Sequence, residues 1–579
     1  MKRFNKQVLN LFMLISALLS STSDIFTQSS SDCCPGSKSR AYWQPRAASS
    51  YSLNNALLLK DIVIYEDEDS AKEKHHYLGA VSEYMHNFSN GSTGLGANPF
   101  WSGTNSMTVG NNDGKSNVDG YYFGMGEVAE PGLITLNPIV QQVSADLFYN
   151  YQHKKQGRSF VAKLYLPIGM MKTQAKLCEQ APVLDDSWCP DSTPACPESV
   201  LYPAGSNINT TMKEAFNTGT NYNVDPLLAI ALKATHLSAL QYGKISCCPL
   251  TTVGCADLSV VLGCNVVNEE KGFCMVGVKA TLPTGNVPTA QYMFEPIFGR
   301  GGYWGLGIEL SGAYKNFEWR DNKFDFYVQG EVLHLGTGRK PMWRSFDLAL
   351  NGPGSRYMFV SYVAPLGNGG DVSPEIVPSV VTSAINITTM PVISSYPVEG
   401  SLALFLNITR HDKWSIGLGV EGWGRTQERL SIDTCNVTNN KQINLNDFAV
   451  LGRQLIPLTF TDVTSGSIPS NTPYYLCEPL ARINKSQDQV MSGSASYDTT
   501  LIKDARIPKN RIPSDFDEAL DICSAQQPRA FSGKAMLAVG YNWSDSDYQP
   551  NITVFGAGEF ADKTMANFWS VGCKGSFNF

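Results

Sequence analysis

Apolar and polar residues alternate with a period of two along much of this 579-residue chain. In the stretch 303–315, Trp304 and Leu310 fall on one face of an extended strand, and Glu309 and Lys315 fall on the other. A period of two is that of a β-strand, and unlike faces mean that each strand separates two different surroundings. The pattern predicts an all-β protein whose strands have one apolar and one polar face.

Twelve stretches show this pattern, and most are joined in pairs by short polar turns. The predicted strands are 77–88, 143–152, 159–169, 254–264, 272–285, 303–314, 323–335, 401–409, 414–424, 534–541, 551–560 and a last strand from about 565 to 579. Longer polar stretches separate the pairs, near 89–132, 170–253, 338–400 and 433–530. Short turns at one end of the strands and long loops at the other are typical of transmembrane β-barrels.

Charged residues within the predicted strands fall on the polar face only. A charge that faces lipid at mid-membrane costs about 2–4 kcal/mol, so a membrane wall keeps charges off its outer face. Charges as frequent as these cannot be buried in a dry core without pairing, but they can line water. The candidate lumen-lining residues are Lys163, Lys279, Glu309, Lys315, Asp325, Glu331, Glu421, Arg425, Lys534, Glu559 and Lys574.

These patterns predict a closed antiparallel transmembrane β-barrel of about 12 strands (range 10–16), with short periplasmic turns and long extracellular loops. Backbone groups in lipid must all be paired, so the sheet must close and the last strand must pair with the first. One short helix is expected in a loop, where Asp225 can cap it and Pro226 fits its first turn. A secreted β-sandwich, which also alternates, is the competing architecture.

The first residues have the features of a secretory signal peptide. Lys2, Arg3 and Lys6 form a positive region, an apolar run follows, and small residues precede a cut near Asp24. The domain plan is therefore a signal peptide at 1–23, a periplasmic or luminal segment at 24–76 and the barrel at 77–579. A single N-terminal anchor helix is the alternative to a cleaved signal.

Composition narrows the function classes. Charged residues make up only 17% of the chain, below the soluble average of about 25%, and the net charge of −7 argues against nucleic acid as a partner. Fourteen cysteines after a signal peptide suit an oxidising compartment and disulfides. The cysteines lack zinc-site spacing and the seven histidines lack a catalytic motif, so we expect no metal, no cofactor and no enzyme.

The chain ends in "GCKGSFNF" (572–579), and on this ending and the paired strands it resembles a Gram-negative outer-membrane β-barrel. A terminal phenylalanine preceded by apolar residues at alternate positions resembles the signal read by the barrel-assembly machinery. Here that signal comprises Phe579, Phe577, Cys573 and Val571. Cysteine content and loop size are similar to the major outer-membrane porins of intracellular bacteria, whose surfaces are disulfide-stabilised. The resemblance implies an outer-membrane location and contact with its lipid.

The leading functional hypothesis is a porin-like passive channel for small polar solutes, with a lumen of mixed charge. The alternative is a surface adhesin or structural protein with an occluded barrel, whose disulfide-stabilised loops bind host molecules or a second copy of the chain. A third reading is a secreted glycoprotein with glycans on Asn-x-Ser/Thr sites. These sites are Asn87, Asn90, Asn209, Asn386, Asn407, Asn436, Asn484, Asn542 and Asn551.

Overall fold

The computed structural model describes residues 46–578 apart from several segments. The gaps are 69–73, 89–99, 185–208, 219–238, 363–380, 437–444, 458–472, 478–480, 486–518 and 544–547, together with gaps of one or two residues. Among the residues described, no helix is both long and apolar enough to cross a membrane. The expected helix at Asp225 lies outside the described residues, and so does the terminal Phe579.

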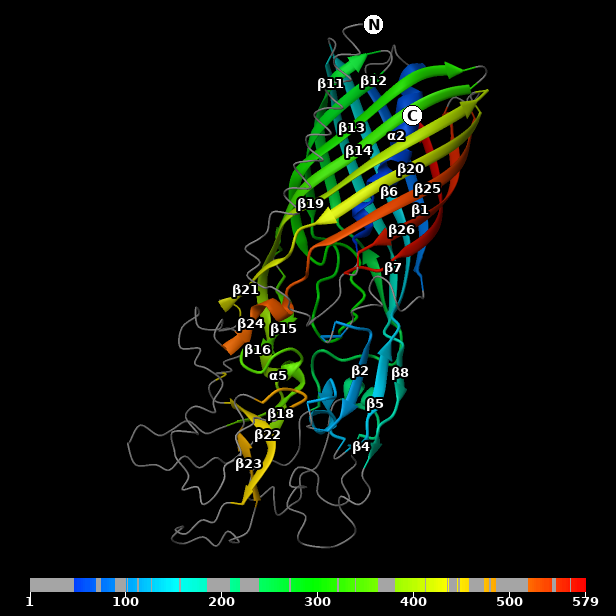
Figure 1. The fold of residues 1–579 in the computed structure, drawn as a ribbon. Coiled ribbons are helices and arrows are strands. Elements are labelled where there is room, and N and C mark those ends of the chain that lie inside the picture. The colour runs from blue at the N-terminus through cyan, green and yellow to red at the C-terminus, as the bar shows by residue number, and fades with distance from the viewer. Residues whose placement is uncertain are drawn as a thin grey trace.

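Twelve antiparallel strands close into a barrel (Figure 1), as the alternation predicts. Around the wall they are β7 (Arg158–Gln174), β11 (Leu258–Glu269), β12 (Gly272–Leu282), β13 (Tyr303–Trp319), β14 (Asn322–Thr337), β19 (Thr389–Arg410), β20 (Trp414–Arg425), β25 (Ala530–Asn542), β26 (Asn551–Ala561), β27 (Phe568–Asn578), β1 (Lys74–Asn87) and β6 (Ile139–Lys155). Pairing between β6 and β7 closes the ring. The last strand pairs with the first, from Tyr77 opposite Asn578 to Asn87 opposite Phe568.

The wall has an apolar outer face. Ile308 of β13 is 57% exposed and Leu418 of β20 is 51% exposed, whereas Glu309, next to Ile308, is fully buried. Aromatic residues stand at both ends of the strands, with Trp414 where β20 begins and Trp304 where β13 begins. An outward apolar band between aromatic rims is the surface that a bilayer requires.

A helix that the sequence pattern does not reveal lies inside the barrel. Helix α2 (Ser52–Glu68) follows the short 3-10 turn η1 (Ala48–Ser50) and packs against β1, β13, β14, β19, β20 and β27 (Figure 1). Its 17 residues rise about 25 Å, which matches the height of a barrel's apolar band. Leu, Ala and Lys favour the helical conformation, and apolar and polar side chains occur on all its sides because wall surrounds it.

Several strands run past the barrel at the end with the long loops. There β7 pairs with β10 (Leu250–Cys255), and β19 pairs with β15 (Met342–Ser345) and β21 (Arg429–Ile432). Strand β19 begins at Thr389, whereas the sequence pattern predicted its start at residue 401. The first half was predicted to be a loop because Pro391 and Pro397 are unusual within a strand. We call this end of the molecule the loop end and the opposite end the turn end.

The loop end carries a cap built from small sheets. These are β2 (Ser106–Gly110), β3 (Val118–Asp119), β5 (Gly132–Leu136) and β8 (Leu177–Gln180); β17 (Phe359–Tyr362), β18 (Val381–Ser383), β22 (Phe448–Pro457) and β23 (Pro473–Cys477); β4 (Val128–Glu130) with β9 (Val183–Leu184); and β16 (Asp347–Leu348) with β24 (Leu520–Asp521). Short helices join them: η3 (Gly120–Phe123), α3 (Met212–Thr218), η5 (Ser355–Tyr357), α5 (Ile385–Thr388) and η7 (Ile522–Ala525).

An aromatic core holds the cap together. The ring of Trp101 packs on Tyr357, whose ring also contacts Phe123 and Phe216. Buried polar residues reinforce this core. Glu428 is their hub, because its carboxylate accepts hydrogen bonds from Tyr303, Arg344 and Ser394 side chains and from the Gln527 backbone. The cap and the protruding strands are therefore joined by one buried carboxylate.

Candidate functional site in the barrel interior

The predicted lumen-lining residues all lie on barrel strands. Ten of them are buried, and even Lys315, the most accessible of the ten, is only 8% exposed; Asp325 is half-buried. Most of them pair with one another or with the N-terminal segment instead of facing a channel in this conformation. That they line a conducting path stays a prediction.

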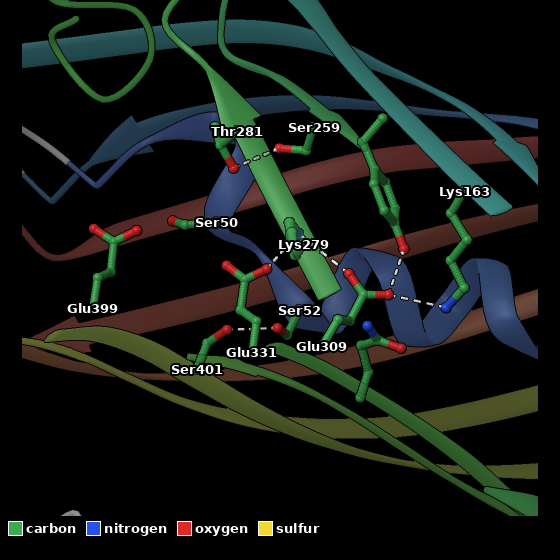
Figure 2. Close-up of polar contacts among 12 residues, drawn as sticks. Ser50, Ser52, Lys163, Ser259, Lys279, Thr281, Glu309, Glu331, Glu399 and Ser401 are labelled. Atoms are coloured by element: carbon green, nitrogen blue, oxygen red, sulfur yellow. Dashed lines mark hydrogen bonds and ion pairs between the residues drawn. The ribbon is translucent and has the colours of Figure 1, made fainter. Parts of the chain in front are cut away.

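One wall of the interior carries a chain of alternating charges that crosses neighbouring strands (Figure 2). Glu309 accepts hydrogen bonds from Lys163 (2.9 Å) and Lys279 (3.3 Å), and Lys279 also binds Glu331 (2.5 Å). The chain continues through Arg300, which lies 3.4 Å from Glu331 and 2.8 Å from Glu399. Three cations and three carboxylates alternate along it, so every charge has an opposite neighbour.

Arg46, the first residue that the structure describes, fastens the segment before α2 to strands β20 and β26. Its guanidinium donates to Glu421 of β20 and to Glu559 of β26, the latter at 3.1 Å. The same Glu421 accepts the backbone N–H of Ser52 at 2.9 Å, which satisfies one of the free N–H groups at the start of α2. Two wall carboxylates therefore hold the residues that lead into α2. We call α2 and the residues from Arg46 that precede it the plug.

A second set of contacts holds α2 nearer the turn end. Asp61 binds Lys574 of β27 at 2.5 Å, and Lys60 donates to Ser415 of β20 at 2.7 Å. Between the two ends, Asn54 donates to Glu83 of β1 at 3.0 Å, and Glu83 also binds Lys534 at 2.7 Å. Polar contacts thus occur along the helix from Ser52 to Asp61.

Apolar packing adds to these polar contacts. Leu53, Leu57, Leu58 and Leu59 are buried against wall side chains, and burying a leucine contributes about 1.5–3 kcal/mol. Glycine in the wall leaves space for the side chains of α2. A Cβ on Gly419 would lie 2.5 Å from Cδ1 of Leu53, so a larger residue there would push the helix away. The side chains of the wall and of the helix are fitted to each other.

Several residues of this site were not among the predicted ones: Arg46, Ser52, Asn54, Lys60, Asp61, Glu83, Arg300 and Glu399. Glu83 lies on the polar face of a predicted strand, so the alternation could have identified it. Glu399 follows Pro391 and Pro397 in a stretch that was predicted to be a loop, and Arg300 lies in the glycine-rich connection 299–302, where no periodic signal exists. The N-terminal residues carry no strand pattern at all.

Three residues of the predicted assembly signal, Val571, Cys573 and Phe577, lie on the outer face of β27, and Phe579 lies outside the described residues. Val571 and Phe577 are exposed, as is the free thiol of Cys573. Their recognition by an assembly machinery remains a prediction. Cys264 is also outward and free, whereas Cys274 of β12, on the same strand face as the exposed Val276, is buried at 7% exposure. Cys523 forms a disulfide.

Most of the possible glycan acceptors in the described residues are inaccessible. The asparagines at 87, 386, 407, 542 and 551 are all at most 8% exposed. A bulky glycan requires an exposed side chain, so these five sites do not fit the secreted glycoprotein hypothesis. Among the described residues, no group of three or more histidine, cysteine or acidic side chains could hold a metal ion.

The closed sheet, the apolar outer band and the unequal loops define an outer-membrane-type β-barrel whose interior is filled by its own helix. No protein-family model and no curated protein matches the chain. Solved structures with some likeness include an outer membrane channel from Pseudomonas putida F1, with 9% identity, a TM-score of 0.32 and coverage of 87% of this chain and 96% of that chain.

Two further structures are the TodX deltaS2S3 mutant monoaromatic hydrocarbon channel and a Pseudomonas aeruginosa FadL homologue. The first has 10% identity, a TM-score of 0.27 and coverage of 94% of this chain and 96% of that chain. The second has 8% identity, a TM-score of 0.25 and coverage of 88% and 90%. At TM-scores below 0.5, these likenesses identify neither a family nor a solute.

Proposed function

We propose that this protein is a gated channel in the outer membrane of a Gram-negative bacterium, closed in this conformation by α2. Small polar solutes would cross when the helix shifts. The observation that carries the proposal is the polar, ion-paired interior of a barrel whose outer face is apolar. A signal peptide at 1–23 and recognition of the Phe577 region by the assembly machinery belong to the same proposal.

The chemistry of the interior favours a channel over a solid anchor. A barrel that only anchors loops is stabilised best by an apolar filling, because buried ion pairs cost desolvation energy that they regain only with good geometry. Here the described strands of the ring retain at least twelve buried charged residues, the ten predicted ones together with Glu83 and Glu399. Water entering the lumen would stabilise those charges when the helix leaves, so a hydrated open state costs less than it would in an apolar barrel.

One observation favours the alternative, a surface or structural protein. In this conformation α2 fills the ring, and the cap at the loop end has its own large buried core, which would keep a partner-binding surface in a fixed shape. Host molecules or a second copy of the chain are the partners this alternative implies. A barrel that never opens would be its signature.

A reversible disulfide cross-link between α2 and the wall can test whether the protein is a gated channel or a structural protein. An ideal Cβ at Gly419 lies 3.4 Å from Cγ of Leu53, the position that the sulfur of a cysteine at 53 can take. This is close to the distance of about 3 Å between the sulfur of one cysteine and the Cβ of the other in a disulfide. The variant Leu53→Cys with Gly419→Cys should therefore cross-link α2 to β20. In planar bilayers we expect conductance steps from the wild type, none from the oxidised variant, and steps again after reduction.

Each single-cysteine variant is the matched control, because it keeps the other half of the tether and the native thiols. It should conduct with and without reductant. A wild type without conductance steps would refute the channel and favour the structural function. Equal conductance from oxidised and reduced double variants, with the cross-link verified by mass, would show that α2 is not the gate.

A further inference from the structure

The place where Arg46 is held is built from wall residues that would remain when the N-terminal segment moves. Glu421 and Trp423 lie on β20, and Glu559 lies on β26. All three side chains are almost fully buried and point inward, with Trp423 at 1% exposure. We call Glu421, Glu559 and Trp423 the cation cage.

The cage surrounds the guanidinium of Arg46 with complementary groups. Two carboxylates accept its N–H groups, and its Cζ lies 5.3 Å from the centre of the Trp423 ring. Tyr51, on the same segment as Arg46, covers the guanidinium with its ring at 4.1 Å. Carboxylates arranged around a planar cation, together with an aromatic face, are the features by which proteins recognise guanidinium and ammonium groups.

The cage has too few cations of its own. On the strand between the two carboxylates, Lys534 stands opposite both Glu421 and Glu559 in the pairing register. Its ammonium group instead binds Glu83, at 2.7 Å. Arg425 is a positive neighbour on the Trp423 side, with Cζ 5.7 Å from the ring. Without Arg46, therefore, Glu421 and Glu559 would lose the cation that they share, while Lys534 is paired with Glu83.

One oxygen of the cage is available even in the closed state. Oε2 of Glu421 is buried and makes no hydrogen bond among the described residues, although Oε1 accepts from both Arg46 and Ser52. A buried carboxylate oxygen without a donor is costly, and a ligand with several N–H groups would satisfy it. The cage can thus accept more donors than Arg46 supplies.

We infer that the cation cage is a binding site for small organic cations of the guanidinium or primary ammonium class, which Arg46 occupies in the closed state. This inference rests on the proposed channel function and names the solutes that the channel favours. A cation that enters the cage competes with Arg46, so the solute itself loosens the attachment of the plug to the wall.

The test uses the full chain with Arg46→Ala and compares guanidinium with urea. Urea has the same planar shape but no charge, so it controls for everything except the positive charge. At millimolar concentration, we expect guanidinium to raise the thermal unfolding midpoint of Arg46→Ala in detergent, while urea and potassium do not. The triple variant with Glu421→Gln and Glu559→Gln should show no such rise, because the cage has lost its charges.

A conductance arm tests transport by the same site. In bilayers, Arg46→Ala should pass guanidinium in preference to chloride, and the triple variant should lose at least threefold of that preference. Binding without any conductance would refute the channel but keep the site. Conductance with no guanidinium-specific rise in the midpoint, or with an anion preference, would overturn the inference while the channel stands.

If Arg46→Ala does not assemble, the wild type replaces it. Guanidinium then competes with Arg46, so it should increase the fraction of time that the wild-type channel is open, whereas urea at the same concentration should not. The same response from a variant with Glu421→Gln and Glu559→Gln would overturn the inference, because the cage would not be its cause.

Discussion

Lys279 is the residue whose removal tests most directly whether the barrel interior is dry. Its ammonium group lies between two buried carboxylates, Glu309 at 3.3 Å and Glu331 at 2.5 Å. Methionine has nearly the same length and no charge, so Lys279→Met keeps the packing and removes one cation. The charge chain then holds two cations and three carboxylates, and one buried negative charge is unmatched.

The expected cost follows from burial. Removing one partner of a buried ion pair costs about 3–5 kcal/mol, whereas an exposed pair contributes about 0–1 kcal/mol. Glu309 keeps Lys163 at 2.9 Å and Glu331 keeps Arg300 at 3.4 Å, so we expect the lower end, about 3 kcal/mol. This is roughly a hundredfold change in the folding equilibrium.

Urea unfolding of the refolded barrel in lipid vesicles, followed by the mobility of the folded form on unheated gels, measures this free energy. Lys323→Met is the matched control, because Lys323 is exposed at the turn end of β14 and should change stability by no more than about 0.5 kcal/mol. Adding Glu331→Gln to Lys279→Met restores the charge balance and should recover most of the loss. If Lys279→Met costs less than about 1 kcal/mol, the charges are hydrated and the dry, paired interior is refuted.

Three other predictions concern the outer face, the cap and the thiols. Leu418→Arg, at the middle of the lipid face, should destabilise the barrel by about 2–4 kcal/mol, whereas Ile552→Arg, at the turn end, should cost about 0–1 kcal/mol. Equal losses of unfolding free energy in lipid vesicles would contradict a membrane-facing apolar band. Glu428→Gln should make the cap sensitive to protease while the unheated barrel keeps its gel mobility, and an unchanged digestion pattern would show that the hub is dispensable. A water-soluble maleimide should label Cys247 in intact membranes but Cys573 only after unfolding, and mass spectrometry of the peptides would show the difference. Labelling of Cys573 before unfolding would show that this face of β27 does not contact lipid.

The strands could be predicted because a wall between lipid and a polar interior imposes its period on the sequence. Ile308 and Glu309 are neighbours in the chain, yet one faces outward and the other inward, and only a strand separates them so completely. The order of the strands also followed, since adjacent hairpins leave a single way to close the ring. The alternation therefore predicted the fold class, the number of strands and the face on which the residues of the predicted strands lie, but not the first half of β19.

The plug and the pairing of charges could not be predicted in the same way. A helix enclosed by wall has no water-facing side, so "SLNNALLLKDIVIYEDE" shows no apolar stripe of helical period. That Lys279 meets Glu331 and Arg46 meets Glu559 depends on side chains from distant parts of the chain, which no local pattern encodes. The alternation predicts the face of the sheet on which a side chain lies, but not the side chains that it contacts.

The closing of β27 on β1 sets the order in which the molecule can be built. Helix α2 comes first in the chain, but the strand that confines it, through Lys574 and Asp61, comes last. Until β27 docks on β1, the wall has an open side, and after it docks no gap remains between these strands through which a helix could enter sideways. A chain truncated before β27 would therefore leave the ring open beside α2 and would lack the Lys574 that binds Asp61.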